Sequence, residues 1–342
     1  MSDRGTAEQG GKMLFLRKRL GVLLLIWGMP LIARAQVHLL DLVIRAYSGP
    51  YAARSTAEIK ERVDEMAVLL KHSTAPVEAL ALAVDKTNYL EILFSLSRRH
   101  QDLAPAAVPL LVAFALAWAP WLDTNLPTAR RDHQRECGRP LPPVTLASIE
   151  ESFLDLWEHR HQGEFGLEEL PWELLGFIAD CDTPIAEREW ARERYREGKK
   201  PDEVFKPDDV FEDPPFDFDH YGKGQAKKIT GQDFTLPNLL KYGGVCREQA
   251  YYAAQVYKCM GRPAVILVQL GRFGVSHSWS GYLHLLGKQR LWNLAVGRWR
   301  NQDYFSGRLE PAVLPGVETD HELTSLLAAL TKGKQDRNRK KI

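Results

Sequence analysis

The sequence has few cysteines, with only four in 342 residues: Cys137, Cys181, Cys246 and Cys259. So few thiols exclude a small disulfide-rich scaffold, which needs many cross-links in a short chain. The chain also lacks net charge, since 45 basic residues stand against 44 acidic ones. A near-neutral chain offers no general attraction for nucleic acid, so we expect no nucleic-acid partner. A hydrophobic fraction of 45%, in a chain long enough for roughly two domains, predicts a globular protein with a substantial core.

The first 35 residues have the pattern of a secretory signal peptide. A basic cluster at residues 17–19 precedes a short apolar run at 20–32, and Ala-Arg-Ala at 33–35 is typical of a cleavage site. We therefore expect cleavage near Ala35 and export to the periplasm or beyond, with an uncleaved signal anchor as the alternative. Cleavage would leave 39 basic and 42 acidic residues, a net charge of −3, in a compartment that permits disulfides.

A second apolar stretch, residues 103–122, contains no charged side chain and is long enough to cross a membrane. It is interrupted by Pro105, Pro109 and Pro120 and is rich in alanine. These features favour a buried helix of a globular domain. We therefore expect no membrane span in the mature chain.

Hydrophobic periodicity predicts an irregular all-helical domain over residues 36–198. The expected helices lie at 55–71, 76–83, 90–96, 146–157 and 185–196. Residues 199–224 then combine four prolines with six aspartates, which is typical of an acidic, Pro-rich linker. Its carboxylates do not have the spacing of an ordered calcium loop.

The pattern changes again in residues 225–315. A helix is expected from Cys246 to about residue 260, ended by Gly-Arg-Pro at 261–263, and strands are expected at 264–270, 275–285 and 290–296. Small residues at Ala250 and Ala253 would let the helix pack closely on an antiparallel sheet. Residues 316–342 are expected to form a C-terminal helix and a basic tail. The predicted fold class is α+β.

Cys246 has the sequence context of a reactive thiol. It follows two glycines and begins a helix, where free backbone N–H groups and the helix dipole favour a thiolate. His277 lies in a predicted strand 31 residues later, and histidine can act both as general base and as general acid. Alternation places His277 and Trp279 on one face of that strand and Ser278 and Ser280 on the other.

Three short segments together resemble the core of the transglutaminase-like superfamily. They are Gly-Val-Cys-Arg-Glu-Gln-Ala at 244–250, Gly-Arg-Pro-Ala at 261–264 and His-Ser-Trp at 277–279. The resemblance covers residues 230–310, about a quarter of the chain. It implies a papain-like α+β domain with a Cys-His-Asp triad. Members of the superfamily include protein cross-linkers, envelope peptidases and amidases, and modules that have lost activity.

The sequence departs from this pattern at the third triad position. Where the resemblance places an aspartate, the chain reads Asn293-Leu294-Ala295 and contains no carboxylate. Asn293 could orient the His277 ring, as asparagine does in papain-like proteases. If Ala295 occupies the position instead, the triad is incomplete. The sequence leaves a working site and an impaired one as alternatives.

Other candidate groups have weaker signals. The Cys246 backbone N–H is the natural oxyanion donor, with Gln225 and Gln232 as alternatives. Cys246 and Cys259 lie on one predicted helix about 20 Å apart, too far for a disulfide. Cys137 and Cys181 are therefore the expected pair if a disulfide forms. His133 and Cys137 are spaced by one helical turn, but no second ligand pair has metal spacing, so we expect neither a metal nor a cofactor.

The leading hypothesis is an exported, transglutaminase-like cysteine enzyme that acts on amide or peptide carbonyls. Cys246 would form an acyl-thioester, His277 would transfer the proton and Asn293 would orient it, with hydrolysis favoured over cross-linking. The substrate would be a protein or peptide, such as a peptide of the cell envelope. The alternative is a catalytically impaired scaffold or binding module of the envelope. An arylamine acetyltransferase-like enzyme also has a Gly-Gly-x-Cys helix start but fits the other motifs less well.

Overall fold

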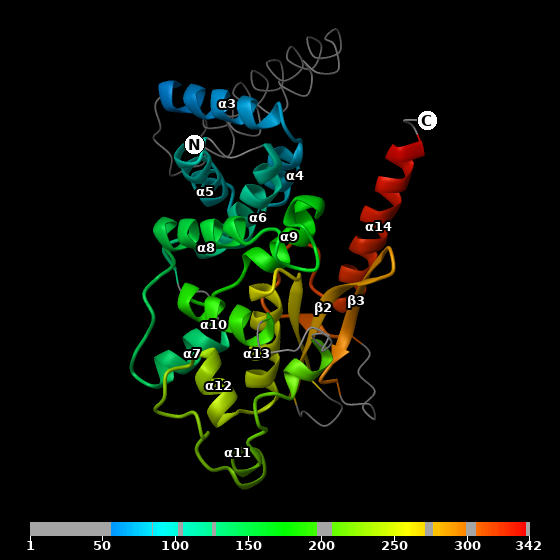
Figure 1. The fold of residues 1–342 in the computed structure, drawn as a ribbon. Helices are drawn as coiled ribbons and strands as arrows, with labels where there is room; N and C mark the ends of the chain where they lie inside the picture. The colour runs from blue at the N-terminus through cyan, green and yellow to red at the C-terminus, as the bar shows by residue number, and fades with distance from the viewer. Residues whose placement is uncertain are drawn as a thin grey trace, which may run out of the picture. The chain divides into compact units, whose positions relative to one another are not determined.

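The computed structural model describes residues 56–83, 85–101, 105–124, 128–196, 207–270, 276–298 and 306–339. Within these ranges the chain has twelve α-helices and one four-stranded antiparallel sheet, so the α+β class is confirmed (Figure 1). The predicted signal peptide, the first part of the predicted linker and the end of the basic tail lie outside the described residues. The papain-like arrangement stays a prediction.

The helices precede the sheet in the sequence, apart from one that follows it. Their bounds are α3 Thr56–Leu70, α4 Ala75–Leu82, α5 Lys86–Arg99, α6 Val108–Trp118, α7 Ala129–Glu136, α8 Leu146–Glu158, α9 Trp172–Ala179, α10 Ile185–Arg196, α11 Phe218–Lys223, α12 Leu236–Tyr242, α13 Cys246–Cys259 and α14 Asp320–Arg339. The strands are β1 Ala264–Leu270, β2 Ser276–Leu286, β3 Gln289–Val296 and β4 Arg308–Leu309. Short 3-10 turns are η1 Pro105–Ala107, η2 Ala119–Trp121, η3 Leu167–Glu169 and η4 Pro207–Phe211.

The chain divides into two compact units, Met1–Val77 and Glu78–Ile342. In the first unit the described part consists of α3 and the beginning of α4. The second unit contains the remaining helices, the whole sheet and every candidate residue. The domain boundaries expected from composition near residues 198 and 224 stay predictions.

Most predicted elements are confirmed within one or two residues. The helix expected at 55–71 is α3, the one at 146–157 is α8, and the one at 185–196 is α10. The first strand has the predicted bounds, and the hairpin turn lies at Gly287, whose φ of 63° favours glycine. These segments were predictable because their hydrophobic spacing alone fixes the element type.

The apolar stretch at 103–122 contains α6, flanked by η1 and η2. All α6 residues except Pro109 are buried, and the indole N–H of Trp118 donates to the carbonyl of Ala179 at 2.8 Å. Phe114 packs edge-on against Phe153 of α8, with ring centroids 5.6 Å apart. The prediction of a buried helix is therefore confirmed. In the part of the chain that the structure describes, no helix has the length and apolarity needed to cross a membrane.

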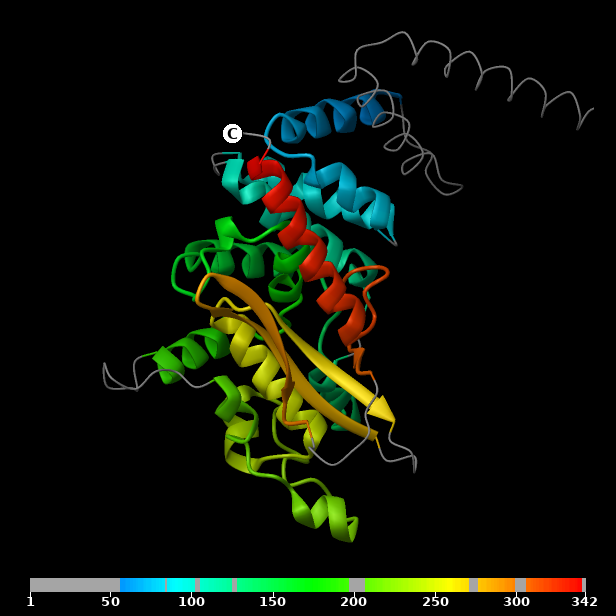
Figure 2. The ribbon, with the colours of Figure 1, turned by 90° about the vertical axis from the view of Figure 1, so that its right-hand side faces the viewer.

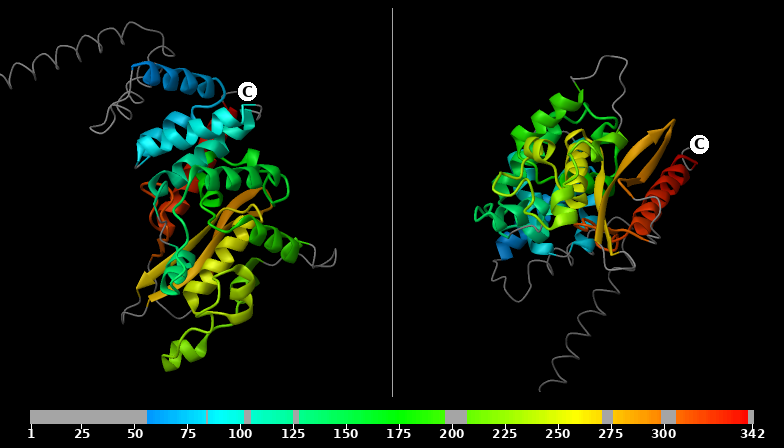
Figure 3. Two further views of the ribbon diagram at one scale, coloured as in Figure 1. Left: turned by 90° about the vertical axis from the view of Figure 1, so that its left-hand side faces the viewer. Right: turned by 90° about the horizontal axis from the view of Figure 1, so that it is seen from below.

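The sheet lies between α13 and α14 (Figures 2 and 3). Its strand order is β3-β2-β1-β4, and all neighbours are antiparallel. On the α13 side, Tyr282 of β2 packs against Tyr257 with ring centroids 4.7 Å apart. On the other side, Trp279 lies against Gly307, whose carbonyl accepts the backbone N–H of Asp320 at the start of α14. Tyr282 and Trp279 therefore lie on opposite faces of β2, the first toward α13 and the second toward the segment that precedes α14.

The described part of the predicted linker, residues 207–224, contributes buried side chains to the domain. Val210 and Phe211 of η4 are buried. Asp217 is only 1% exposed and accepts backbone N–H groups of His220 and Lys228 at 3.3 and 2.8 Å. These hydrogen bonds satisfy the buried carboxylate, which composition alone assigned to solvent.

A buried ion cluster joins α8 to α10. The Asp155 carboxylate accepts hydrogen bonds from Arg192 at 2.6 Å and from Arg188 at 3.2 Å, and all three side chains are buried. Burial alone would raise the pKa of Asp155, but the two guanidinium groups outweigh it and hold the pKa below its ordinary value. Removal of the carboxylate would leave two cations buried without their partner.

We expect Asp155→Ala to lower the free energy of unfolding by about 3–5 kcal/mol near pH 7. Because the folded pKa is lowered, the carboxylate stabilises the fold above its unfolded pKa of about 3.9. That stabilisation is lost as the pH falls through the folded pKa, so the difference from the unsubstituted chain should shrink below about pH 4. Urea unfolding from pH 3 to 8 measures both effects. Glu158→Ala, an exposed change on the same helix, should have little effect at any pH.

Candidate functional site

Cys246 begins α13, as the sequence predicts, because the preceding backbone turns sharply. Gly243 has a φ of 74°, and a Cβ there would lie 1.9 Å from the carbonyl oxygen of Pro215. That oxygen instead accepts the N–H of Gly244 at 3.1 Å. The two glycines therefore let residues 214–217 pair directly with the segment before Cys246.

The Cys246 thiol is partly buried, and its pKa lies above the ordinary value. Burial is the main cause, and the nearby carboxylate of Glu248 adds to it. The backbone at Ser278, Arg247 and Cys246 lowers the pKa, but by less. The thiol is therefore mainly protonated at neutral pH, contrary to the thiolate expected from its position at a helix N-terminus.

Glu248 is a site residue that the sequence analysis missed. Its carboxylate accepts the N–H of Val245 at 2.9 Å and a hydrogen bond from Lys227 at 2.7 Å, and the residue is 2% exposed. This is the N3 position of a helix, where a glutamate commonly caps the first turn. The Gly-Val-Cys-Arg-Glu spacing contained that signal. The cap needed to start the helix places a negative charge beside the thiol.

His277 is buried in β2, and its orientation is fixed by a backbone carbonyl. Its Nε2 donates to the oxygen of Gly297 at 2.9 Å, which leaves Nδ1 as the basic nitrogen in the neutral ring. The ring stacks beside Trp279, with centroids 5.9 Å apart and an interplanar angle of 19°. Burial lowers the pKa of His277, and the Gly297 carbonyl opposes this less strongly. The histidine is therefore mainly neutral at neutral pH.

Cys246 and His277, the two central residues of the predicted site, lie on opposite sides of the sheet. Tyr282 faces α13, and β2 pairs with β1 in unbroken register from Ser276 to Tyr282. Side chains alternate along a strand, so Ser278 also faces α13 whereas His277 and Trp279 face the α14 side. The structure brings the Cys246 thiol to the Ser278 backbone, one residue from His277, but does not bring the thiol and the imidazole to one face.

Asn293 does not orient His277, which corrects the predicted role. The β2–β3 register places Asn293 opposite Tyr282, five residues along β2 from the histidine. Its amide donates to Asp208 at 2.7 Å, and its side-chain oxygen accepts the N–H of Ala295 at 3.2 Å. The Gly297 carbonyl takes the orienting role instead. A backbone acceptor has no side-chain signature, so the sequence could not indicate it.

The other predicted donors and thiols are also separated. Gln225 and Gln232 are exposed. Cys137 lies 3.4 Å from the ring Nε2 of His133, whereas Cys181 is buried against α13. The expected Cys137–Cys181 pairing is therefore wrong for this structure, in which all four cysteines are free thiols. No cluster of three or more metal-ligating side chains occurs among the described residues.

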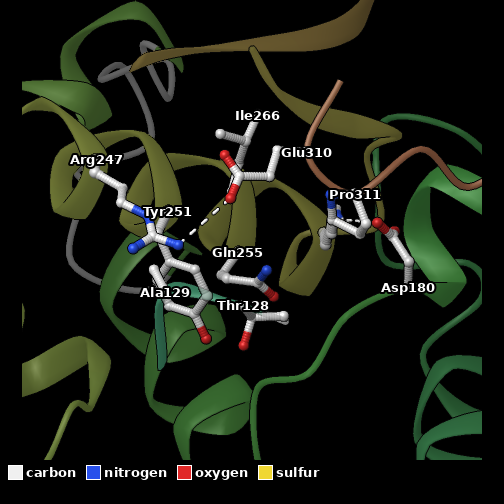
Figure 4. A pocket seen from close by; sticks show the side chains of 10 residues that line it. Thr128, Ala129, Asp180, Arg247, Tyr251, Gln255, Ile266, Glu310 and Pro311 are labelled. Atoms are coloured by element: carbon white, nitrogen blue, oxygen red, sulfur yellow. Dashed lines mark hydrogen bonds and ion pairs between the residues drawn. The ribbon is translucent and has the colours of Figure 1, made fainter. Parts of the chain in front are cut away.

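A small cavity flanks α13 (Figure 4). Its volume is about 20 Å³, room for about one water molecule. Arg247 reaches across it to Glu310 at 3.4 Å and also contacts Asp132 at 2.9 Å. At its other end Asp180 pairs with Lys258 at 2.6 Å, and burial raises the pKa of this carboxyl despite the cation. The ion pairs that line the cavity fix α13 against its neighbours, and the cavity itself lacks space for an organic substrate.

An exposed aromatic cluster lies next to the start of α13. Phe218 and Tyr221 of α11 are 72% and 53% exposed. Both contact Phe216, with ring centroids 4.9 and 5.5 Å apart. Phe216 forms a β-bridge with Gly244, two residues before the thiol. Contiguous exposed aromatic side chains of this kind are typical of binding surfaces.

Comparison with known proteins adds no further assignment. No protein-family model, curated protein or solved structure matches the chain.

We expect Glu248→Gln to shift alkylation of Cys246 to lower pH, because it removes the carboxylate charge that raises the thiol pKa. The rate of iodoacetamide labelling of the Cys246 peptide, followed by mass spectrometry across pH 6–10, measures this shift. Glu193→Gln, on exposed α10 surface, is the matched control and should leave the profile unchanged. An unchanged profile in Glu248→Gln would contradict the assigned electrostatics.

Proposed function

We propose that the chain is a transglutaminase-like module of the cell envelope that binds a protein or peptide partner without acyl-transfer chemistry. The observation that carries this proposal is that the His277 side chain lies on the face of β2 that points away from α13, the helix that begins with Cys246. Formation of an acyl-thioester requires a base within hydrogen-bond reach of the thiol. In this proposal the transglutaminase-like motifs have a structural role and no catalytic one.

The electrostatics support the same proposal. Burial raises the pKa of Cys246 and lowers the pKa of His277. Both shifts favour a neutral thiol and a neutral imidazole over the thiolate–imidazolium pair of an activated cysteine. A neutral thiol is a weak nucleophile.

The aromatic cluster of Phe216, Phe218 and Tyr221 is the proposed binding surface. Its nearby charges are compensated within the chain: Lys223 pairs with Asp219 at 2.8 Å, and Lys228 with the same carboxylate at 3.4 Å. A neutral aromatic surface favours apolar or aromatic side chains of a peptide over a highly charged partner. The signal-like N-terminus and the motif resemblance support an envelope location for that partner.

A second candidate is the cysteine hydrolase expected from the sequence. The proximity of the Cys246 thiol to the Ser278 backbone favours it, because only one residue separates this contact from His277. The hydrolase would require the imidazole to reach the α13 side of β2. The two candidates predict different behaviour of the same thiol.

Substitution of His277 separates these candidates. His277→Gln retains an amide donor for the Gly297 carbonyl but removes the base. For a binding module we expect the alkylation rate of Cys246 at pH 7 to stay within about twofold of the unsubstituted chain, because the imidazole does not activate the thiol. A decrease of about tenfold or more would overturn the proposal in favour of the hydrolase. Cys137 is the internal control, and circular dichroism verifies folding.

The binding surface has its own test, using phage-displayed random peptides selected on the full chain. We expect selected peptides to lose at least about tenfold in affinity for the Phe218→Ser, Tyr221→Ser double variant, since exposed aromatic residues commonly dominate such interfaces. Leu286→Ser is the matched control, because Leu286 is 64% exposed at the distant β2–β3 turn. Equal binding by both variants would exclude the aromatic cluster as the surface.

A further inference from the structure

Cys181 and Cys259 form a buried thiol pair far from Cys246 along α13. Cys181 follows the end of α9, and Cys259 is the last residue of α13. They are 1% and 2% exposed, and both are free thiols. The two side chains lie close enough for a hydrogen bond between them to shift both pKa values. Neither was expected to meet the other on the basis of sequence spacing.

Several contacts fix the Cys181 segment on α13. The Cys181 thiol donates to the Gln255 side chain at 3.2 Å, one helical turn before Cys259. The Cys181 carbonyl accepts a hydrogen bond from Arg188 at 2.9 Å, and the adjacent Asp180 pairs with Lys258 at 2.6 Å. The Cys181 segment is therefore held beside the last turn of α13, which ends at Cys259.

The pair is electrostatically asymmetric. Burial alone would raise the pKa of Cys181, but the hydrogen bond from Cys259 and the charges of Arg188 and Lys258 lower it below the ordinary value. Burial, followed by the same hydrogen bond, raises the pKa of Cys259. Such a pair has one sulfur suited to nucleophilic attack and a second suited to resolve the product.

Cys181 also has access to a small molecule, although its exposed area is low. It lines a cavity of about 130 Å³ together with Thr183, Ser148 and Ser152. A water molecule occupies about 30 Å³ in the liquid, so a small hydroperoxide fits this space. The cavity is too small for a peptide or a protein oxidant.

We propose that Cys181 and Cys259 form a dithiol site that reduces a small hydroperoxide and closes to a disulfide. The Cys181 thiolate attacks the terminal peroxide oxygen and the O–O bond breaks, which gives Cys181 sulfenic acid and, after protonation, water or an alcohol. The Cys259 sulfur then attacks the Cys181 sulfur, the S–O bond breaks, and the hydroxide leaves as water. In total two thiols and one hydroperoxide give one disulfide, one water and one further water or alcohol.

This proposal does not depend on the proposed binding function, since it uses neither Cys246 nor the aromatic cluster. The disulfide would join the α9–α10 connection to the end of α13, closing a loop of about 80 residues. Closure of a loop of that length restricts the unfolded chain, so the oxidised protein should have a thermal midpoint roughly 5–10 °C higher than the reduced one.

The test is a titration of the reduced full chain with hydrogen peroxide, followed by tryptic mapping without reductant. Each of the four cysteines falls on a separate tryptic peptide, so the linkage is unambiguous. We expect a Cys181–Cys259 linked peptide at lower peroxide concentration than any modification of Cys137 or Cys246. Linkage of Cys137 to Cys181, or free Cys181 and Cys259 after Cys137 has been oxidised, would overturn the proposal.

Single variants test the order of the two steps. With Cys259→Ser, dimedone should label a sulfenic acid on Cys181, whereas Cys181→Ser should give no label on Cys259. Cys137→Ser is the matched control and should form the Cys181–Cys259 disulfide at the same peroxide concentration. Labelling of Cys259 in place of Cys181 would contradict the assigned nucleophile. If a variant fails to fold, the mapping of the unsubstituted chain decides the outcome.

Discussion

Helix α13 is buried along nearly its whole length, so its polar side chains must find hydrogen-bond partners inside the protein. The segments that supply those partners are arranged around the helix. From Glu248 to Cys259 every residue is buried. Its four buried polar or charged side chains contact three flanking segments: Glu248 contacts Lys227, Gln249 contacts the Pro214 carbonyl, and Gln255 and Lys258 contact Thr183 and Asp180 of the α9–α10 connection. Because an unpaired buried polar group is costly, these contacts fix how three flanking segments pack on the helix. The sheet then covers the face that carries small residues.

The elements of this arrangement could be predicted from the sequence, but their partners could not. The glycines before Cys246 and the Gly-Arg-Pro at 261–263 indicated the bounds of α13, and a continuous β-rich run indicated β1. The position of Asp217, by contrast, depends on N–H groups of Lys228 and His220 that approach only in the folded chain. Composition therefore assigned residues 207–224 to solvent, although Val210, Phe211 and Asp217 are buried.

The geometry of the candidate site also depends on contacts between residues that are far apart in the sequence. The sequence correctly placed Cys246 at a helix start and His277 in a strand, and it correctly separated His277 from Ser278 by alternation. It could not indicate which of the two faces α13 covers. A shift of one residue along a strand moves each side chain to the other face of the sheet. The order and spacing of the motifs are therefore the same whether or not the histidine faces the thiol. The hairpin register similarly moves Asn293 away from His277, while Gly297 supplies the acceptor.

The two ends of α13 show why helix position alone does not determine thiol chemistry. At the N-terminus, the favourable backbone groups around Cys246 are opposed by burial and by the glutamate that caps the helix. Near the C-terminus, where the dipole would disfavour a thiolate, Cys181 approaches from another segment between Arg188 and Lys258. Full side-chain charges in a buried site interact more strongly than the partial charges of a helix end. Sequence motifs did not indicate the lowered pKa of Cys181, since Lys258, one of the cations beside it, approaches only in the folded chain.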